Sequence, residues 1–216
     1  MPNVAYIRAE AVNGCRFCLF LFRSMSISIA DLTLKSRSYR RFEQNRKIER
    51  DVLERLVDLV RFCPSARNMQ PLKFLLSHTA ERNALIFPIL AWAGYLRTWP
   101  GPAEGERPAA YIVMLEDQQL SRSTAIDQGI VAQTIMLGAA ERGLGGCIIA
   151  AFKREQLAQA LGLPEHLHPV LVLALGYPAE QVQLVDMPES GAVEYYRDQR
   201  DVHCVPKRKL VDLIVG

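Results

Sequence analysis

The stretch from residue 122 to residue 142 constrains the fold most, because it is apolar on almost every side. Its large apolar residues are Ile126, Ile130, Val131, Ile135, Met136 and Leu137. On a helix these positions are spread around the axis and do not form a single apolar stripe. A helix with this pattern is buried on most of its faces. The fold therefore has to supply packing partners on several sides of residues 122–142.

Apolar patterns elsewhere predict alternating helices and strands. In residues 48–62 the apolar positions recur at steps of three and four, which is typical of an amphipathic helix, and Pro64 follows its end. Helices are also predicted over 81–95, interrupted by Pro88, and over 153–161. Strands are predicted over 73–78, 109–117 and 169–177, and residues 143–152 are predicted to be a glycine-rich turn that runs into a strand. This alternation predicts a layered domain of sheet and helices.

The C-terminal region has a different character. From Gly191 onward the chain is polar and charged, and it ends in the strand-like sequence LVDLIV at 210–215. A chain end is ordered only when something ties it down. We expect this end to dock on another surface, which in a homo-oligomer is the partner subunit.

Length and composition favour one domain without a nucleic-acid function. The chain has 216 residues, half of them hydrophobic, which suffices for one sizeable core. A formal net charge of +3 from 26 basic and 23 acidic side chains is too balanced for a duplex-binding protein. Five cysteines at scattered positions do not form a secreted disulfide framework, so a cytoplasmic location is expected.

Residues 1–24 are predicted to be a disordered extension or a misassigned start, and residues 25–216 to be the domain. The apolar run in CRFCLFLF is much shorter than a membrane span, and no small-residue cleavage site follows it. We therefore expect no membrane partner. Cys15 and Cys18 form a C-x-x-C, but no second pair at metal spacing follows, so no metal site is expected.

Two polar stretches have the composition of binding segments. KSRSYRRF at 35–42 combines four basic residues with hydroxyl groups just before a helix, a set that suits a phosphate monoester. PSARNMQP at 64–71 presents hydroxyl and amide groups that both donate and accept hydrogen bonds. Taken alone, the first stretch also fits a solvated basic turn and the second a simple turn.

Two further stretches complete the set. In GLGGCIIAAF at 143–152 the glycines and alanines let the backbone approach a flat ring closely. The glycines precede a strand, so this is not the dinucleotide-binding G-x-G-x-x-G, and no P-loop sequence occurs. PKRKL at 206–210 is either a second arm of a phosphate site or a solvated chain end.

In this order and spacing the stretches RSYRRF, PSARNMQP, DQGIVAQTIMLGAAERGLGGCIIAAF, LALGYPAE and PKRKL resemble the FMN-dependent nitroreductase family. The resemblance covers residues 26 to 215. It implies an α+β fold of three layers, with a central and mainly antiparallel sheet flanked by helices. It also implies an intertwined homodimer with one FMN at each of two subunit interfaces.

The resemblance also implies the cofactor-binding residues. By it, Arg37, Ser38 and Arg40 contact the phosphate and ribityl chain. Lys207 and Arg208 match a C-terminal basic contact to the same phosphate, and which of the adjacent Lys207, Arg208 and Lys209 reaches it is left open. Four loop residues would contact the flavin of the other subunit, and they are Pro64, Ser65, Asn68 and Gln70. The backbone amides of Ala150 and Ala151 would face the flavin ring near N5.

The activity implied is an NAD(P)H oxidoreductase that reduces nitroaromatic, quinone or flavin-type acceptors by ping-pong two-electron transfer. The cofactor would be FMN, with NADH or NADPH as the donor, and no side chain need act as a catalyst. An FMN-binding protein without turnover is the alternative, and a thiol enzyme using Cys63 or Cys204 is a third hypothesis. Two positions depart from the family pattern, Leu72 for a tryptophan and Ile148 for an aromatic residue, and the region shaping the substrate side is short.

The remaining reactive side chains are expected to be structural or solvated. His78 lies at a strand end, His166 and His168 lie in a loop, and His203 lies in the C-terminal region. Cys147 has no basic neighbour in sequence that would lower its pKa, so buried packing is expected.

Overall fold

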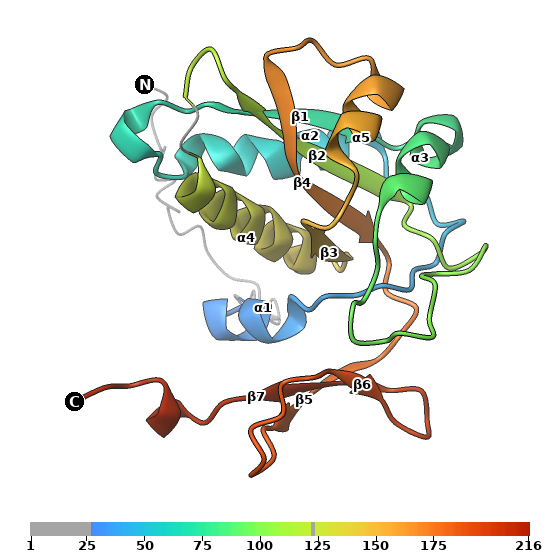
Figure 1. Ribbon diagram of the computed structural model, residues 1–216, viewed down its shortest axis with the longest axis vertical. Helices are drawn as coiled ribbons and strands as arrows, with labels where there is room; N and C mark the ends of the chain where they lie inside the picture. The colour runs from blue at the N-terminus through green and yellow to red at the C-terminus, as the bar shows by residue number, and fades with distance from the viewer. Residues whose placement is uncertain (1–26, 122–123) are drawn as a thin grey trace, which may run out of the picture.

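The computed structural model describes residues 27–121 and 124–216 and shows a four-stranded sheet between two layers of helices (Figure 1). The strand order is β1-β2-β4-β3, and every pair in this sheet is antiparallel. The predicted α+β architecture is therefore confirmed. The expectations for residues 1–24, including the Cys15–Cys18 motif, lie outside the described residues.

The secondary structure follows the chain in a simple order. The α-helices are α1 (Ile29–Lys35), α2 (Arg50–Asp58), α3 (Ala80–Ile86), α4 (Ala125–Glu141) and α5 (Arg154–Leu161). The strands are β1 (Leu72–Ser77), β2 (Ala110–Asp117), β3 (Gly145–Ile149), β4 (Leu167–Gly176), β5 (Val182–Asp186), β6 (Tyr196–Arg197) and β7 (His203–Lys207). Short 3-10 helices are η1 (Leu59–Phe62), η2 (Ala66–Asn68), η3 (Phe87–Ile89) and η4 (Leu210–Asp212).

The sheet is covered on both faces because its central strands β2 and β4 are predominantly apolar. All eight residues of β2 are buried. Alternate side chains point to opposite faces of a strand, so Ile112 and Met114 pack with α2 and α4, whereas Tyr111 and Val113 pack with α3 and α5. Two hydrophobic clusters result, one on each side of the sheet.

Helix α4 has many packing partners, as its composition predicts. It contacts α1, α2, η1, β3 and β4, and Val131, Ile135 and Ala139 are buried against them. Within one chain, however, Ile126 at its N-terminal end is 77% exposed. The described part of one chain therefore does not cover the whole apolar surface of this helix.

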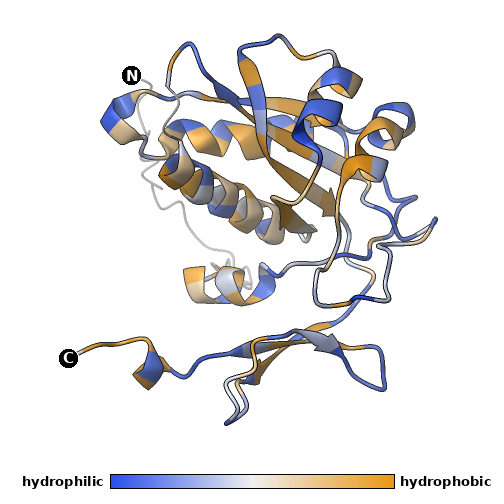
Figure 2. Cartoon of the chain, viewed as in Figure 1, coloured by the Kyte–Doolittle hydropathy of each residue, from blue (hydrophilic) through white to orange (hydrophobic). Residues whose placement is uncertain are grey.

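Two predictions of secondary structure were wrong. The helix predicted over 81–95 ends at Ile86 and is followed only by η3, since Pro88 cannot donate the hydrogen bond of a continuing α-helix. LVDLIV at 210–215 is not a strand in the described chain. It begins with η4, and Figure 2 shows in orange that much of this chain end is hydrophobic. Its apolar side chains are exposed, with Leu210 at 71% and Val215 at 99%.

The C-terminal region forms a second, three-stranded sheet with the order β5-β7-β6. Strand β5 runs parallel to β7, and β6 runs antiparallel to it. Figure 1 shows this sheet beside the main body, with the last residues extending away from it. The region expected to be a polar arm is thus ordered over β6 and β7.

No helix of residues 27–121 and 124–216 is long and apolar enough to cross a membrane.

Gly146 marks a point where the main sheet has no room for a side chain. A Cβ atom here would lie 2.5 Å from the backbone oxygen of Ala174 and 2.9 Å from Cε of Met136. We expect Gly146→Ala to lower the free energy of unfolding by about 1 to 2 kcal/mol, because β3 must shift to relieve the overlap. Urea denaturation checks this, with Gly129→Ala, where the space is open, as the control. Equal stability of both variants would contradict the expectation.

Candidate functional site

A cavity of about 300 Å³ lies between the segment that follows α1, the edge strand β3 and the second sheet. We call it the basic pocket. Its lining residues are Ser36, Arg37, Ser38, Arg40, Gln133, Met136, Gly146, Ile148, Val182, Tyr195, His203, Val205 and Lys207. Four of the predicted site residues, Arg37, Ser38, Arg40 and Lys207, are therefore brought together although up to 170 residues separate them.

The backbone of the basic stretch is held along the free edge of β3. Ser38 forms a parallel bridge with Gly146, and the Tyr39 N–H donates to the Gly146 carbonyl at 2.9 Å. Helix α1 ends at Lys35, so the chain is extended where it passes this edge. The neighbouring Gly145 allows the close approach, since a Cβ atom there would lie 2.5 Å from Cδ2 of Tyr39, and this explains how a glycine-rich strand and a basic stretch form one wall.

Arg40 is a buried cation without a carboxylate partner. The residue is 9% exposed, and its Nη1 donates to the Ser38 carbonyl at 3.2 Å. Its guanidinium lies 4.7 Å from the centre of the Tyr195 ring. Within the described residues no carboxylate oxygen lies within 4.0 Å of it. Because a buried charge is costly unless paired, this pocket is suited to an anion.

His203 is the second polar side chain buried in the basic pocket, so of the two environments expected for it, structural or solvated, it does not have the solvated one. It is 1% exposed, and its Nε2 lies 3.0 Å from Nη1 of Arg40. Because a guanidinium only donates, Nε2 must accept and the proton lies on Nδ1, which has no partner within residues 27–121 and 124–216. Burial and the neighbouring Arg40 charge lower the pKa of His203 to about 4.

The other cations of the pocket differ in how they are held. Arg37 donates from Nη2 to the Thr33 carbonyl, while its buried Nε has no partner in the described chain. Lys207, Arg208 and Lys209 are all exposed, but Lys207, at the end of β7, is the one among the lining residues of the cavity. Of these three cations the structure therefore brings Lys207 to the basic pocket.

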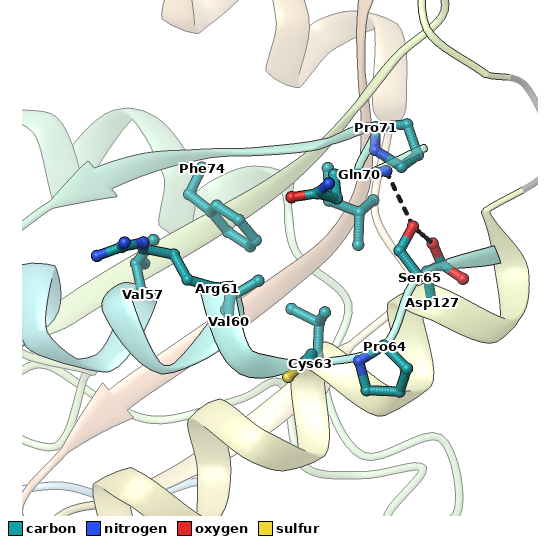
Figure 3. A pocket seen from close by; sticks show the side chains of 12 residues that line it. Val57, Val60, Arg61, Cys63, Pro64, Ser65, Gln70, Pro71, Phe74 and Asp127 are labelled. Carbon is teal, nitrogen blue, oxygen red and sulfur yellow. Dashed lines mark hydrogen bonds between the residues drawn. The ribbon is translucent and has the colours of Figure 1, made fainter. Parts of the chain in front are cut away.

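The polar loop at 64–71 lies at a different cavity of about 200 Å³, the loop pocket, which Pro64, Ser65, Gln70 and Leu72 line together with Asp127 (Figure 3). Ser65 Oγ donates to Asp127 at 2.6 Å and accepts from the Gln70 N–H at 2.9 Å. The Ala66 N–H also donates to Asp127, at 3.1 Å. A buried carboxylate on α4 therefore anchors the loop.

The loop backbone is strained. Arg67, Asn68 and Gln70 have positive φ values of 52°, 55° and 49°. Asparagine tolerates this region, but for the other two residues it costs roughly 1 kcal/mol each. Gln70 Nε2 donates to Asn68 Oδ1 at 3.1 Å, which helps to hold the conformation. Such clusters of strained residues occur at binding sites, where surrounding contacts maintain them.

Not all the predicted residues line the basic pocket or the loop pocket. The two pockets share no lining residue. Asn68 is exposed beside the loop pocket, and Ala150 and Ala151 are exposed just after β3. The Ala151 carbonyl accepts from the Ala91 N–H at 2.9 Å. Within one chain the predicted site is therefore divided into two half-sites.

The cysteines give little support to thiol chemistry. Cys147 and Cys204 are both 5% exposed, and burial raises the pKa of the Cys147 thiol, as its predicted packing role requires. Cys63 is half-buried, with its Sγ 3.3 Å from Oγ1 of Thr134. In the described ranges no group of three or more His, Cys, Asp or Glu side chains is placed to hold a metal ion.

Several site residues were missed from the sequence. Asp127 carries a usable signal, since it is an acidic residue near the start of an otherwise apolar helix. Tyr195, His203 and Gln133 carry none, because they reach the basic pocket only through the fold of the second sheet and the packing of α4. Ile148, noted for its departure from the family pattern, lines the basic pocket.

Comparison with known proteins identifies the fold and the family. A putative NADH dehydrogenase/NAD(P)H nitroreductase of Methanothermobacter thermautotrophicus is 25% identical over 153 residues, 68% of this chain and 76% of the relative. The putative NAD(P)H nitroreductase YodC of Bacillus subtilis is 25% identical over 182 residues, covering 66% and 86%. A solved nitroreductase family protein from Clostridium difficile has a TM-score of 0.57 at 25% identity, covering 71% of this chain and 86% of that one.

A solved structure from Streptococcus pneumoniae, also of a nitroreductase family protein, has a TM-score of 0.62 at 18% identity and covers 88% of this chain and 99% of that one. The sequence model described as "Nitroreductase family" matches residues 34–177, two thirds of the chain. It includes the basic stretch, the polar loop and all four strands of the main sheet. The chain therefore belongs to the nitroreductase family.

Proposed function

We propose that the protein is an FMN-dependent NAD(P)H oxidoreductase that acts as a homodimer on nitroaromatic, quinone or flavin-type acceptors. The observation that carries the proposal is the buried Arg40 guanidinium, which lies in the basic pocket without a carboxylate partner. Family membership and the names of the relatives, which refer to NAD(P)H nitroreductases, support the same activity.

The residues of the basic pocket fit the phosphate and ribityl chain of FMN. Arg37, Arg40 and Lys207 provide positive charge around one cavity, and Ser38 adds a hydroxyl donor. Charge-assisted hydrogen bonds from guanidinium groups are the strongest that a protein offers to phosphate. The buried Nε of Arg37, which lacks a partner, and Nδ1 of His203 add unsatisfied donors at the same place.

Apolar residues of the pocket fit the less polar part of the cofactor. Met136 and Ile148 line the basic pocket, and Gly146 keeps one wall free of a side chain. Ile148 is 41% exposed, so part of this wall faces outward. These side chains would exclude water from one side of a ring system. Bound FMN would supply two-electron transfer from NADH or NADPH to the acceptor in a ping-pong sequence.

A second copy of the chain would complete the site. Ser65, Asn68 and Gln70 lie outside the basic pocket of their own chain, so a homodimer is the arrangement in which both half-sites contact one cofactor. Exposed apolar side chains support such an interface. Three large apolar side chains are strongly exposed in one chain, namely Phe62 (77%), Ile126 (77%) and Leu213 (63%). Extensive exposed apolar surface often marks a contact with another protein.

Arg40→Met tests the cofactor assignment. The dissociation constant for FMN is expected to rise about 10- to 100-fold, because charge-assisted hydrogen bonds to the phosphate are lost. Binding of riboflavin, which lacks the phosphate, should change by less than about threefold. Fluorescence quenching of each flavin measures both constants. Arg50→Met, which removes an exposed arginine of α2, is the control. Equal losses for both flavins would contradict the phosphate assignment.

Turnover is tested separately. NADH or NADPH should bleach the flavin absorption of the reconstituted protein, and a nitroaromatic compound or quinone should restore it. Reconstituted protein that retains FMN but is bleached by neither nucleotide would instead indicate a flavin-binding protein without turnover. Failure to bind FMN at all would refute the proposed function.

A further inference from the structure

Glu180 is a buried carboxylate next to the basic pocket. Its side chain is 2% exposed. Oε1 accepts from the backbone N–H groups of Arg40 and Arg41, the latter at 3.1 Å. Oε2 accepts from Nη2 of Arg197 at 2.6 Å. Glu180 therefore fixes the backbone that carries Arg40, but its ion pair is with a different arginine.

Arg197 is held in place on several sides. Its side chain is 13% exposed, and Nη1 donates to the Asp201 carbonyl at 3.2 Å. Its guanidinium lies 5.5 Å from the centre of the Trp99 ring. Arg197 is not among the residues that line the basic pocket. It therefore has no direct contact with a ligand bound there.

The ion pair between Glu180 and Arg197 determines which arginine remains available to a ligand in the basic pocket. A carboxylate as buried as Glu180 requires a cation, since an unpaired buried charge is strongly destabilising. Three guanidinium groups, those of Arg197, Arg40 and Arg41, are attached to segments that Glu180 contacts through hydrogen bonds. Arg41 has its own carboxylate partners, Glu106 and Asp201. Because Arg197 takes the ion pair with Glu180, Arg40 is left facing the pocket, and its contacts within the described residues are a carbonyl, a histidine and a tyrosine ring.

We propose that Arg197 is a positioning residue for the cofactor: by neutralising Glu180 it keeps the Arg40 guanidinium available to the phosphate of the ligand. The inference rests on the proposed function, since it assigns FMN to the basic pocket. Glu180 and Arg197 lie in residues 178–216, beyond the part of the chain that matches the family model. The Glu180–Arg197 ion pair therefore belongs to the C-terminal region of this chain.

Arg197→Met leaves Glu180 without its cation, and Glu180 then competes with the ligand for Arg40. The dissociation constant for FMN is expected to rise about tenfold, while that for riboflavin stays within about threefold of wild type. In the double variant Glu180→Gln/Arg197→Met the competing charge is gone. FMN affinity should return to within about threefold of wild type. A merely structural role for Arg197 predicts no such recovery.

The experiment measures FMN and riboflavin binding by fluorescence quenching for the wild type, both single variants and the double variant. Arg200→Met is the matched control, because Arg200 is an exposed arginine of the same turn. Thermal melting shows which variants are folded. If Arg197→Met does not fold, Glu180→Gln alone decides, since its FMN affinity should equal or exceed that of the wild type.

Different results would refute the proposed function and the positioning role of Arg197. Wild-type protein that does not bind FMN refutes the proposed function. Wild-type protein that binds FMN, with Arg197→Met binding equally well, overturns the role of Arg197. A double variant as weak as Arg197→Met, or a tenfold loss in Glu180→Gln, overturns it as well. A loss of riboflavin affinity equal to that of FMN would show a general disturbance of the pocket instead.

Discussion

Replacing Asp127 by alanine is expected to lower the free energy of unfolding by about 3 kcal/mol and to release the polar loop. The carboxylate is 3% exposed and accepts from Ser65 Oγ and from the Ala66 N–H. Each buried donor left without a partner costs about 1 to 3 kcal/mol. The positive φ values at Arg67 and Gln70 would also relax once Ser65 is free.

Urea denaturation measures this loss, and protease cleavage within 64–71 reports the release of the loop. Asp58→Ala is the matched control, because Asp58 forms an exposed ion pair with Arg61 and should change stability by less than about 0.5 kcal/mol. Asp127→Asn keeps one acceptor oxygen, so its free energy of unfolding should lie between those of Asp127→Ala and Asp58→Ala. Equal stability of Asp127→Ala and wild type would show that the loop is held by other contacts.

The parts of the fold that could be predicted are those where local sequence and tertiary environment agree. The apolar run of β2 indicates a strand buried on both faces, and all its residues are buried. The composition of α4 indicates a helix with many partners, and it has them. The end of α3 was placed too late, because the apolar residues after Pro88 continue a helical pattern that the proline ends.

The second sheet could not be predicted, because its pairings join distant and unremarkable segments. Val182 pairs with His203, and nothing in the polar sequence between them indicates a parallel pair of strands. The same limit applies to the site. The basic residues Arg37, Arg40 and Lys207 can be identified as candidates, but the choice of Arg197 as the partner of Glu180 arises only from tertiary packing. Sequence identifies the charged groups but does not determine how they pair.

His203 is expected to make the protein less stable as the pH falls from about 6.5 to about 4. Its pKa is lowered from 6.5 to about 4 in the folded state, by burial and by the charge of Arg40. Above pH 6.5 the imidazole is neutral in both states and contributes nothing. Between these values the unfolded chain binds a proton that the folded chain does not, so stability falls, by up to about 3 kcal/mol in all.

The variant His203→Gln separates this contribution from the rest of the acid response. A glutamine oxygen can still accept from Arg40, but the side chain does not titrate, so unfolding free energies measured in urea should fall less between pH 6.5 and 4 than in wild type. Glu180 opposes the effect and Arg197 adds to it, and both remain in the variant. His168→Gln, which replaces an exposed histidine of β4, is the matched control. Parallel profiles for both variants would show that His203 is protonated as readily in the folded state as in the unfolded chain, and hence that the Arg40 pocket does not hold it neutral.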